Sequence, residues 1–328
     1  MLVKQRPLFF ISMMLGAYLN LRYYFKMIPE FPKFKKIELG DKENIEKITR
    51  YYPPYSDFNF DSLWTWDINN KVKISILNGN LVVRFNDYLT REPFFSFIGD
   101  KKVVATIEVL LAHSKANGML EKLRLLPEVN FSREIKNLNK YMFIEDRDSF
   151  DYIYSNQNLA TFPGFEFSQC RKMCNRFITR NKNIEVRDLD LASIDNRMQV
   201  LDLNHRWKAN KEVDYDSENE KEALNRLLSS ADNLSLINVG VFINNELVAF
   251  TINEKTSKRF ALSHFAKFDI KYVGVYTYSM KVTGERLLKE SYEYMNCEQD
   301  LGLQGLRKAK QALRPVFFLR KYTLTPIR

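Results

Sequence analysis

The stretch near the C-terminus that reads EQDLGLQGLRKAK, residues 298–310, carries the residue types that group-transfer chemistry needs. It begins with acidic side chains, continues through glycines that permit tight turns, and ends in a predicted helix with cations on its first turns. Cations at a helix N-terminus oppose the helix dipole unless an anion binds there as well. The stretch therefore predicts a loop and helix that bind phosphate, formed by Gly302, Gly305, Arg307, Lys308 and Lys310.

Acyl transfer from an activated ester requires a proton acceptor, an oriented nucleophile and stabilisation of the oxyanion. We expect Asp300 to orient or deprotonate the acceptor, with Glu298 as a second candidate for this role. Tyr322 lies on the next predicted strand, from which it would donate a hydrogen bond. The three histidines are scattered, so the sequence gives no support for a Ser-His-Asp or Cys-His nucleophile.

Two basic groups accompany these residues. Seven basic residues and no acidic ones occur from Arg307 to Arg328, and Lys321 is one of them. A second group, which includes Arg171 and Arg176, recurs at helical spacing along a predicted helix. Both groups suit the backbone of tRNA or a lipid phosphate, and a solvated basic face is the alternative. We also count Lys267 among the candidates for binding the acceptor or a nucleic acid.

The whole chain has the composition of an ordinary globular protein, with 45% hydrophobic and 27% charged residues. Its 328 residues predict two domains. The net charge of +10 favours a polyanionic partner, although it also fits simple solubility. The three cysteines are too few for a disulfide framework, and no His or Cys spacing matches a metal site, so we expect a cytoplasmic protein without a metal.

Residues 1–26 differ from the rest of the chain. Their apolar run, residues 7–19, is shorter than the roughly twenty residues that span a bilayer. Three interpretations compete: a signal-like anchor, an interfacial helix, and an extension ahead of a true start at Met27. We favour the last of these.

The elements that must position the candidate residues follow the same order twice. Apolar periodicity and the Asn78-Gly79 turn predict, for residues 27–155, a short helix, a hairpin, a strand, a helix, a strand, a short helix over 131–139, and two strands. Residues 156–328 give helices over 167–180, 194–210 and 221–229, a hairpin around Asn244-Asn245, a strand, a helix over 276–290, a strand, a helix over 306–313, and a strand over 316–322. The repetition indicates two modules of one α+β fold with mixed sheets, divided near residue 155.

This element order is that of the GNAT fold, and several blocks of sequence resemble one bacterial branch of it. These blocks are YSDFNF at 55–60, LWTW at 63–66, NGNL at 78–81, FDYIY at 150–154, RKMCNRF at 171–177 and NCEQDLGLQGLRKAK at 296–310. The chain resembles the family that shares the C-terminal catalytic domain of phosphatidylglycerol lysyltransferase, which is built from tandem GNAT modules. The last block is long and specific, and the resemblance runs from about residue 55 to the C-terminus.

The resemblance implies an aminoacyl or acyl transferase, with aminoacyl-tRNA as the favoured donor and a lipid or small molecule as the acceptor. It implies no bound cofactor, with tRNA and anionic phospholipid as partners, and adds peripheral attachment at the inner membrane face to the expected cytoplasmic location. Ordinary GNAT enzymes hold coenzyme A with a glycine-rich loop before the central helix. The corresponding stretch here, Lys271 to Tyr276, keeps only Gly274 and adds bulky side chains, which suits coenzyme A less well. A coenzyme-A-dependent N-acyltransferase and a non-catalytic module for RNA or anionic lipid remain as alternatives.

Overall fold

The computed structural model describes residues 27–327, apart from residues 69, 88–89, 133–134, 136–138, 210–216 and 257–258. The proposed extension over residues 1–26 lies outside this range, as does most of the short helix predicted over 131–139. The described residues form two sheets of seven strands each, and no described helix is long and apolar enough to cross a membrane.

The first sheet belongs mainly to the N-terminal half. Its strands lie in the order β1 (Lys35–Lys36), β2 (Lys73–Leu77), β3 (Asn80–Asn86), β4 (Pro93–Ile98), β5 (Leu123–Pro127), β14 (Lys321–Pro326) and β6 (Tyr141–Glu145). The predicted hairpin at Asn78-Gly79 is confirmed, since both residues have a positive φ and join β2 to β3. On β3, Val82 packs with α4 (Val103–Ala116), whereas its neighbours Leu81 and Val83 pack with α2 (Lys42–Thr49) and α3 (Phe60–Trp66). The sheet is therefore covered on both faces.

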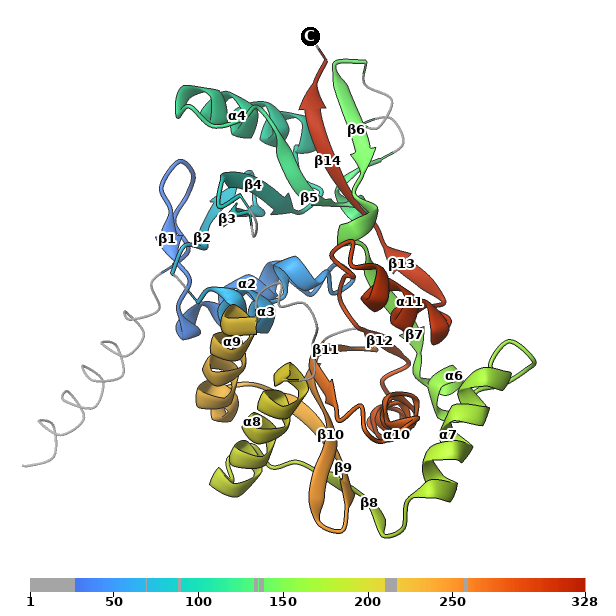
Figure 1. The fold of residues 1–328 in the computed structure, drawn as a ribbon. Helices are drawn as coiled ribbons and strands as arrows, with labels where there is room; N and C mark the ends of the chain where they lie inside the picture. The colour runs from blue at the N-terminus through green and yellow to red at the C-terminus, as the bar shows by residue number, and fades with distance from the viewer. Residues whose placement is uncertain are drawn as a thin grey trace, which may run out of the picture.

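The second sheet belongs mainly to the C-terminal half. Its order is β13 (Phe317–Leu319), β7 (Asp151–Ser155), β12 (Tyr294–Asn296), β11 (Phe260–Phe268), β10 (Glu246–Lys255), β9 (Leu236–Ile243) and β8 (Ile184–Asp188). Figure 1 shows α6 (Asn156–Thr161), α7 (Ser168–Arg180) and α10 (Val275–Lys289) on one side of it, and α8 (Ile194–Ala209) and α9 (Ser217–Ser230) on the other. Short 3-10 helices lie at Leu39–Asp41, Ser56–Phe58, Glu128–Asn130, Arg147–Ser149 and Ala231–Asn233.

The two modules exchange strands. Each sheet has one parallel pair, β4 with β5 and β11 with β12, and the next strand along comes from the other half of the chain. The last strand, β14, pairs with β5 and β6, while β7 pairs with β12 and β13. The single strand predicted over 316–322 is thus two strands, which part at Arg320 and enter different sheets. The predicted architecture of α-helices and mixed sheets is confirmed, but a division at residue 155 does not follow the sheets.

The modules also share a core, into which α3 inserts from the first module. The Trp66 ring stacks on Phe265 of β11 with ring centroids 5.8 Å apart, and the Trp64 indole donates a hydrogen bond to Ser230 at 3.2 Å. Buried apolar residues of both sheets join one continuous cluster around these contacts. This junction fixes the two halves against each other and places polar residues of both beside one pocket.

Candidate functional site

A pocket of about 350 Å³ lies at the module junction and is called the junction pocket below. Its walls come from α3, the ends of β3 and β5, and the loop after β12. Apolar and aromatic side chains line part of it, while basic and acidic side chains converge on the rest. The residues that matter here are Asp57, Ser62, Trp66, Lys71, Phe85, Arg91, Phe94, Arg124, Glu298, Gln299 and Leu301.

Asp57 brings a buried carboxyl group to this pocket. Lys321, fully buried at the start of β14, pairs with Asp57, and its Nζ donates to Asp151 Oδ1 at 2.7 Å. Ser56 completes the group, because its N–H and Oγ donate to the two oxygens of Asp151 at 2.9 and 2.7 Å. Burial raises the pKa of Asp57 to about 6, although Lys321 acts in the opposite direction. Asp57 can therefore exchange a proton near neutral pH.

Behind the pocket wall, His264 of β11 is fully enclosed by polar partners. Its Nε2 lies 2.9 Å from Glu254 Oε2, and its Nδ1 lies 3.5 Å from Glu298 Oε1 and 3.3 Å from Ser62 Oγ. Burial alone would lower the pKa of His264, but the hydrogen bonds with Glu254 and Glu298 outweigh it and raise the pKa to about 10. With this pKa the His264 ring is protonated at neutral pH, so its Nε2 donates to Glu254, while its Nδ1 faces both Ser62 Oγ and Glu298 Oε1.

The contacts of His264 with Ser62 on one side and Glu254 on the other resemble those of a nucleophilic triad. The sequence did not indicate this arrangement. A triad histidine must accept the serine proton, and an imidazolium has no free lone pair to do so. The geometry therefore gives Ser62 the role of a hydrogen-bonding partner in the pocket wall rather than that of a nucleophile.

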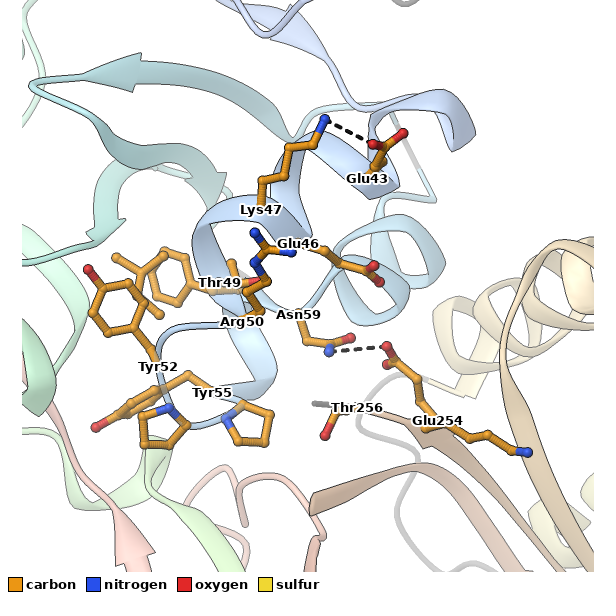
Figure 2. Close-up of a pocket in the computed structure, with 15 residues that line it drawn as sticks. Glu43, Glu46, Lys47, Thr49, Arg50, Tyr52, Tyr55, Asn59, Glu254 and Thr256 are labelled. Atoms are coloured by element: carbon orange, nitrogen blue, oxygen red, sulfur yellow. Dashed lines mark hydrogen bonds and ion pairs between the residues drawn. The ribbon is translucent and has the colours of Figure 1, made fainter. Parts of the chain in front are cut away.

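A second pocket, of about 260 Å³, lies at the other end of this group and is called the side pocket below. Figure 2 shows Asn59 and Glu254 side by side in its lining, where Asn59 Nδ2 donates to Glu254 Oε1 at 3.2 Å. Tyr52, Tyr55 and Arg50 also line the pocket. Glu254 thus touches the side pocket with the same carboxylate that holds His264.

One described group has the composition of a metal site. Asp61, Glu254 and His264 are buried and offer ligand atoms within 4.8 Å of one another. Lys42 Nζ, however, lies 2.7 Å from Asp61 Oδ1, and the imidazolium of His264 supplies a second positive charge. The Lys42 ammonium thus occupies a carboxylate oxygen that a metal ion would need, so the donor set suits a metal ion less well.

The stretch over residues 298–310 borders the junction pocket, but Asp300 does not line it. Asp300 is fully buried, and Arg307 holds its two oxygens at 2.8 and 2.7 Å. Tyr152 Oη donates to it at 2.5 Å and the Gly302 N–H at 2.9 Å. Burial alone would raise the pKa of Asp300, but these hydrogen bonds outweigh it and hold the pKa at about 2. Contrary to our expectation, Asp300 fixes the loop and is poorly suited to accept a proton.

Two basic side chains of this stretch, Arg307 and Lys310, form hydrogen bonds with other groups of the chain. Lys310 Nζ donates to the carbonyls of Cys297, Glu298 and Gln299, and Arg307 donates to Asp148 at 2.6 Å. Lys308 is exposed on α11 (Gln304–Ala312), and Gly305 lies within this helix.

Gly302 has a φ of +73°, and a Cβ there would lie 2.8 Å from Asp148. With Lys310 and Arg307, this tight turn holds the loop in the shape that directs Glu298 and Gln299 to the junction pocket. The residues that were expected to bind phosphate therefore hold this loop in place.

The remaining candidates lie elsewhere. Tyr322 belongs to the first sheet, where its Oη donates to Glu128 at 3.1 Å. Lys267 pairs with Glu220 and covers the Trp207 ring at 3.5 Å, and Lys271 pairs with Asp269 at 3.2 Å. None of these three lysine and tyrosine side chains is among the residues that line the junction pocket.

Gly274 and the basic helix α7 meet at the start of α10. A Cβ on Gly274 would lie 2.2 Å from the Met173 carbonyl oxygen of α7, so α7 fills the space beside this helix N-terminus. The positive-φ glycine at this helix N-terminus therefore serves the close approach of α7. Arg171 donates to the carbonyls of Phe162 and Gly164, whereas Arg176 is exposed on α7.

The sequence analysis missed Asp57, Glu254 and His264 as site residues. A signal was present for two of them, since Glu254 and His264 interrupt apolar strands at positions that the structure shows to be buried. Ionisable side chains are seldom buried without a partner, so such positions point to a polar network.

Known proteins place the chain in a family. A family model for the C-terminal domain of phosphatidylglycerol lysyltransferase matches residues 49–325, and no curated protein matches. Among solved structures, a conserved protein of unknown function from Bacteroides thetaiotaomicron is 26% identical, with a TM-score of 0.79 over 92% of this chain and 100% of that one.

Two further structures share the fold alone. L-PGS from Bacillus licheniformis is 14% identical, with a TM-score of 0.58 over 92% of this chain and 93% of its own. FemX is 6% identical, with a TM-score of 0.54 over 90% and 97%. Family and fold point to a transferase of aminoacyl or acyl groups. The chain belongs to the family defined by the C-terminal domain of phosphatidylglycerol lysyltransferase.

Proposed function

We propose that this protein transfers an aminoacyl group from aminoacyl-tRNA to a hydroxyl or amino group of a lipid or small-molecule acceptor in the junction pocket. The observation that carries the proposal is the Asp57 carboxyl group, which lines this pocket, is buried against Lys321, and has a pKa near 6. A proton acceptor with these properties suits attack on an ester at neutral pH.

In the proposed reaction, Asp57 takes the proton of the acceptor hydroxyl or amine as that atom bonds to the ester carbonyl. The bond between the carbonyl carbon and the 3′ oxygen of tRNA then breaks, and this oxygen takes the proton from Asp57. Protons balance, and no covalent enzyme intermediate forms. Glu298 accepts a hydrogen bond from the acceptor, while the buried ammonium of Lys321 stabilises the ionised form of Asp57 between turnovers.

Basic side chains of the junction pocket support an anionic substrate, and one of them, Arg124, also pairs with Asp87 of the same lining. Lys71, Arg91 and Arg124 all line this pocket, and Arg124 also covers the Phe94 ring at 4.8 Å. Guanidinium groups beside aromatic rings suit a phosphate with an adjoining base or apolar chain. This supports tRNA or an anionic phospholipid as a partner, and the exposed cations of α7 offer further contacts with such polyanions.

A transfer assay tests the proposal. The protein is incubated with a tRNA pool charged with radiolabelled amino acids, including lysine, and with phosphatidylglycerol vesicles or a water-soluble metabolite extract as acceptor. We expect label to leave tRNA and enter an organic or aqueous product, and Asp57→Asn to slow transfer about 100-fold or more. Asp232→Asn is the matched control, because Asp232 is exposed and is not among the residues that line the pocket.

Two results would contradict the proposal. Transfer from acetyl-coenzyme A but not from charged tRNA would favour the coenzyme-A-dependent alternative. Tight binding of tRNA or vesicles without any transfer, unchanged by Asp57→Asn, would favour a non-catalytic binding module.

A further inference from the structure

His264 connects the two pockets through a continuous polar chain. From the junction pocket inward, Glu298 contacts its Nδ1 side, and Glu254 accepts from its Nε2 and reaches the side pocket. His264 lines neither pocket and is fully buried on β11. It contacts the wall of each pocket from behind.

The charged groups around His264 come from four other segments. Glu254 lies on β10, Glu298 on the loop after β12, Asp61 on α3 next to Ser62, and Lys42 on α2, where it pairs with Asp61 at 2.7 Å. Three carboxyl groups thus lie close to two basic side chains inside the junction core, and burial together with the charge of Glu254 raises the pKa of Asp61 to about 7. Buried ion groups are seldom the most stable way to fill a core, so their retention calls for a role beyond stability.

The backbone of Glu298 is held in an unfavourable conformation. Its φ is +57°, a left-handed conformation that is unfavourable for a residue with a Cβ, and its N–H donates to Asn296 Oδ1 at 2.7 Å. Lys310 binds the carbonyls on either side of this position. The backbone is therefore clamped in an unusual shape, and this shape turns the side chain toward both the junction pocket and His264.

We propose that His264 is a positioning residue of the transfer reaction, which holds the Glu298 carboxylate toward the acceptor in the junction pocket and is itself anchored by Glu254 at the side pocket. The proposal rests on the proposed function, since it assumes transfer in the junction pocket. The His264 ring behind Glu298 keeps this carboxylate aligned, so that it accepts the acceptor hydrogen bond in the geometry that Asp57 requires.

The first test is independent of transferase activity. The full-length protein, labelled with ¹⁵N-histidine, is titrated by NMR, and His113→Gln and His205→Gln assign the three imidazole signals. We expect the His264 signal to keep its imidazolium shift at about pH 8, where an ordinary histidine is neutral. Glu298→Gln and Glu254→Gln should each lower the pH at which this signal titrates. A His264 signal that titrates near the ordinary value would overturn the proposal.

The second test uses the transfer assay. His264→Gln should lower kcat about 10- to 100-fold with little change in KM, because substrate binding remains while alignment is lost. Glu298→Gln should have a similar effect, and the double variant should be no slower than either single one, which a merely structural role would not produce. Circular dichroism checks folding, and Glu254→Gln, which keeps a hydrogen-bond acceptor for Nε2, replaces His264→Gln if the latter unfolds.

These tests separate the inference from the proposed function. Absence of transfer by the wild-type protein counts against the function, while the NMR titration still decides the state of His264. Full activity of His264→Gln at every pH would overturn the inference and leave the function intact. Loss of wild-type activity in EDTA, restored by Zn²⁺, would also overturn it, because a metal bound to Asp61, Glu254 and His264 would displace the proton from the ring.

Discussion

At the scale of single residues, the same side-chain type takes opposite roles according to its partners. Asp57 and Asp300 are both buried aspartates near the junction pocket. Asp57 faces one ammonium group and another carboxylate, so its neutral form is accessible. Asp300 receives hydrogen bonds from a guanidinium, a phenol and a backbone N–H, so its charged form is fixed. The surroundings of each carboxyl group therefore decide that Asp57 suits the role of a base and that Asp300 suits a structural role.

The pH dependence of transfer should follow Asp57. A general base works only when deprotonated, so kcat/KM should rise with pH through about 6, the pKa to which burial raises this carboxyl, and level off above it. In Asp57→Asn the rise of kcat/KM with pH should disappear, and kcat/KM itself should fall strongly. A pH–rate profile of both proteins checks the prediction, and an unchanged limb in the variant would assign the base to another group.

Asp300→Asn should destabilise the protein by about 3 kcal/mol at neutral pH, because Arg307 and Tyr152 lose a buried anionic partner. The folded pKa of about 2 lies below the ordinary value of 3.8, so Asp300 contributes stability above that ordinary value and loses it as pH falls toward 2. The difference between wild type and variant should therefore shrink in acid. Urea denaturation at neutral and at acid pH measures the free energy of unfolding of both proteins. A difference that stays constant between the two conditions would contradict the assigned pKa.

At the scale of elements, the packing of α7 against Gly274 limits what the N-terminus of α10 can bind. A helix N-terminus offers N–H groups that can bind a pyrophosphate, and at α10 this end packs against the Met173 carbonyl of α7. The sequence showed that the glycine pattern was incomplete. It did not show that a helix from earlier in the chain fills the space, since this depends on packing between segments about a hundred residues apart.

Gly274→Ala should therefore destabilise the protein by about 2 to 3 kcal/mol, because a Cβ at this φ of +94° would overlap the Met173 carbonyl. Gly305→Ala is the matched control: it lies inside α11, nothing lies within 4 Å of the added Cβ, and alanine should stabilise the helix by up to about 1 kcal/mol. Equal thermal denaturation midpoints for the two variants would show that α7 does not pack against Gly274 as described.

At the scale of the whole molecule, the repeated element order was predictable from periodicity and turn signals, but its connection in space was not. Strands such as β7, which reads DYIYS, and β14, which reads KYTLTP, carry no mark of the sheet they enter, because the alternation of side chains along a strand does not select between the two sheets. The exchange brings Lys321 of β14 to Asp151 of β7 and to Asp57. The proposed base and its ammonium partner are 264 positions apart, which no local spacing reveals.

Lys321 should consequently stabilise both modules at once. Lys321→Met leaves Asp57 and Asp151 buried without a cation, which should cost about 3 to 5 kcal/mol. Hydrogen exchange should then accelerate in β14 and β5 of the first sheet and in β7 of the second, since the lost ion group joins them. Arg320→Met, the neighbouring residue with an exposed ion pair to Glu145, should change stability by less than about 1 kcal/mol. Faster exchange in one sheet only would mean that the exchanged strands do not couple the modules through this lysine.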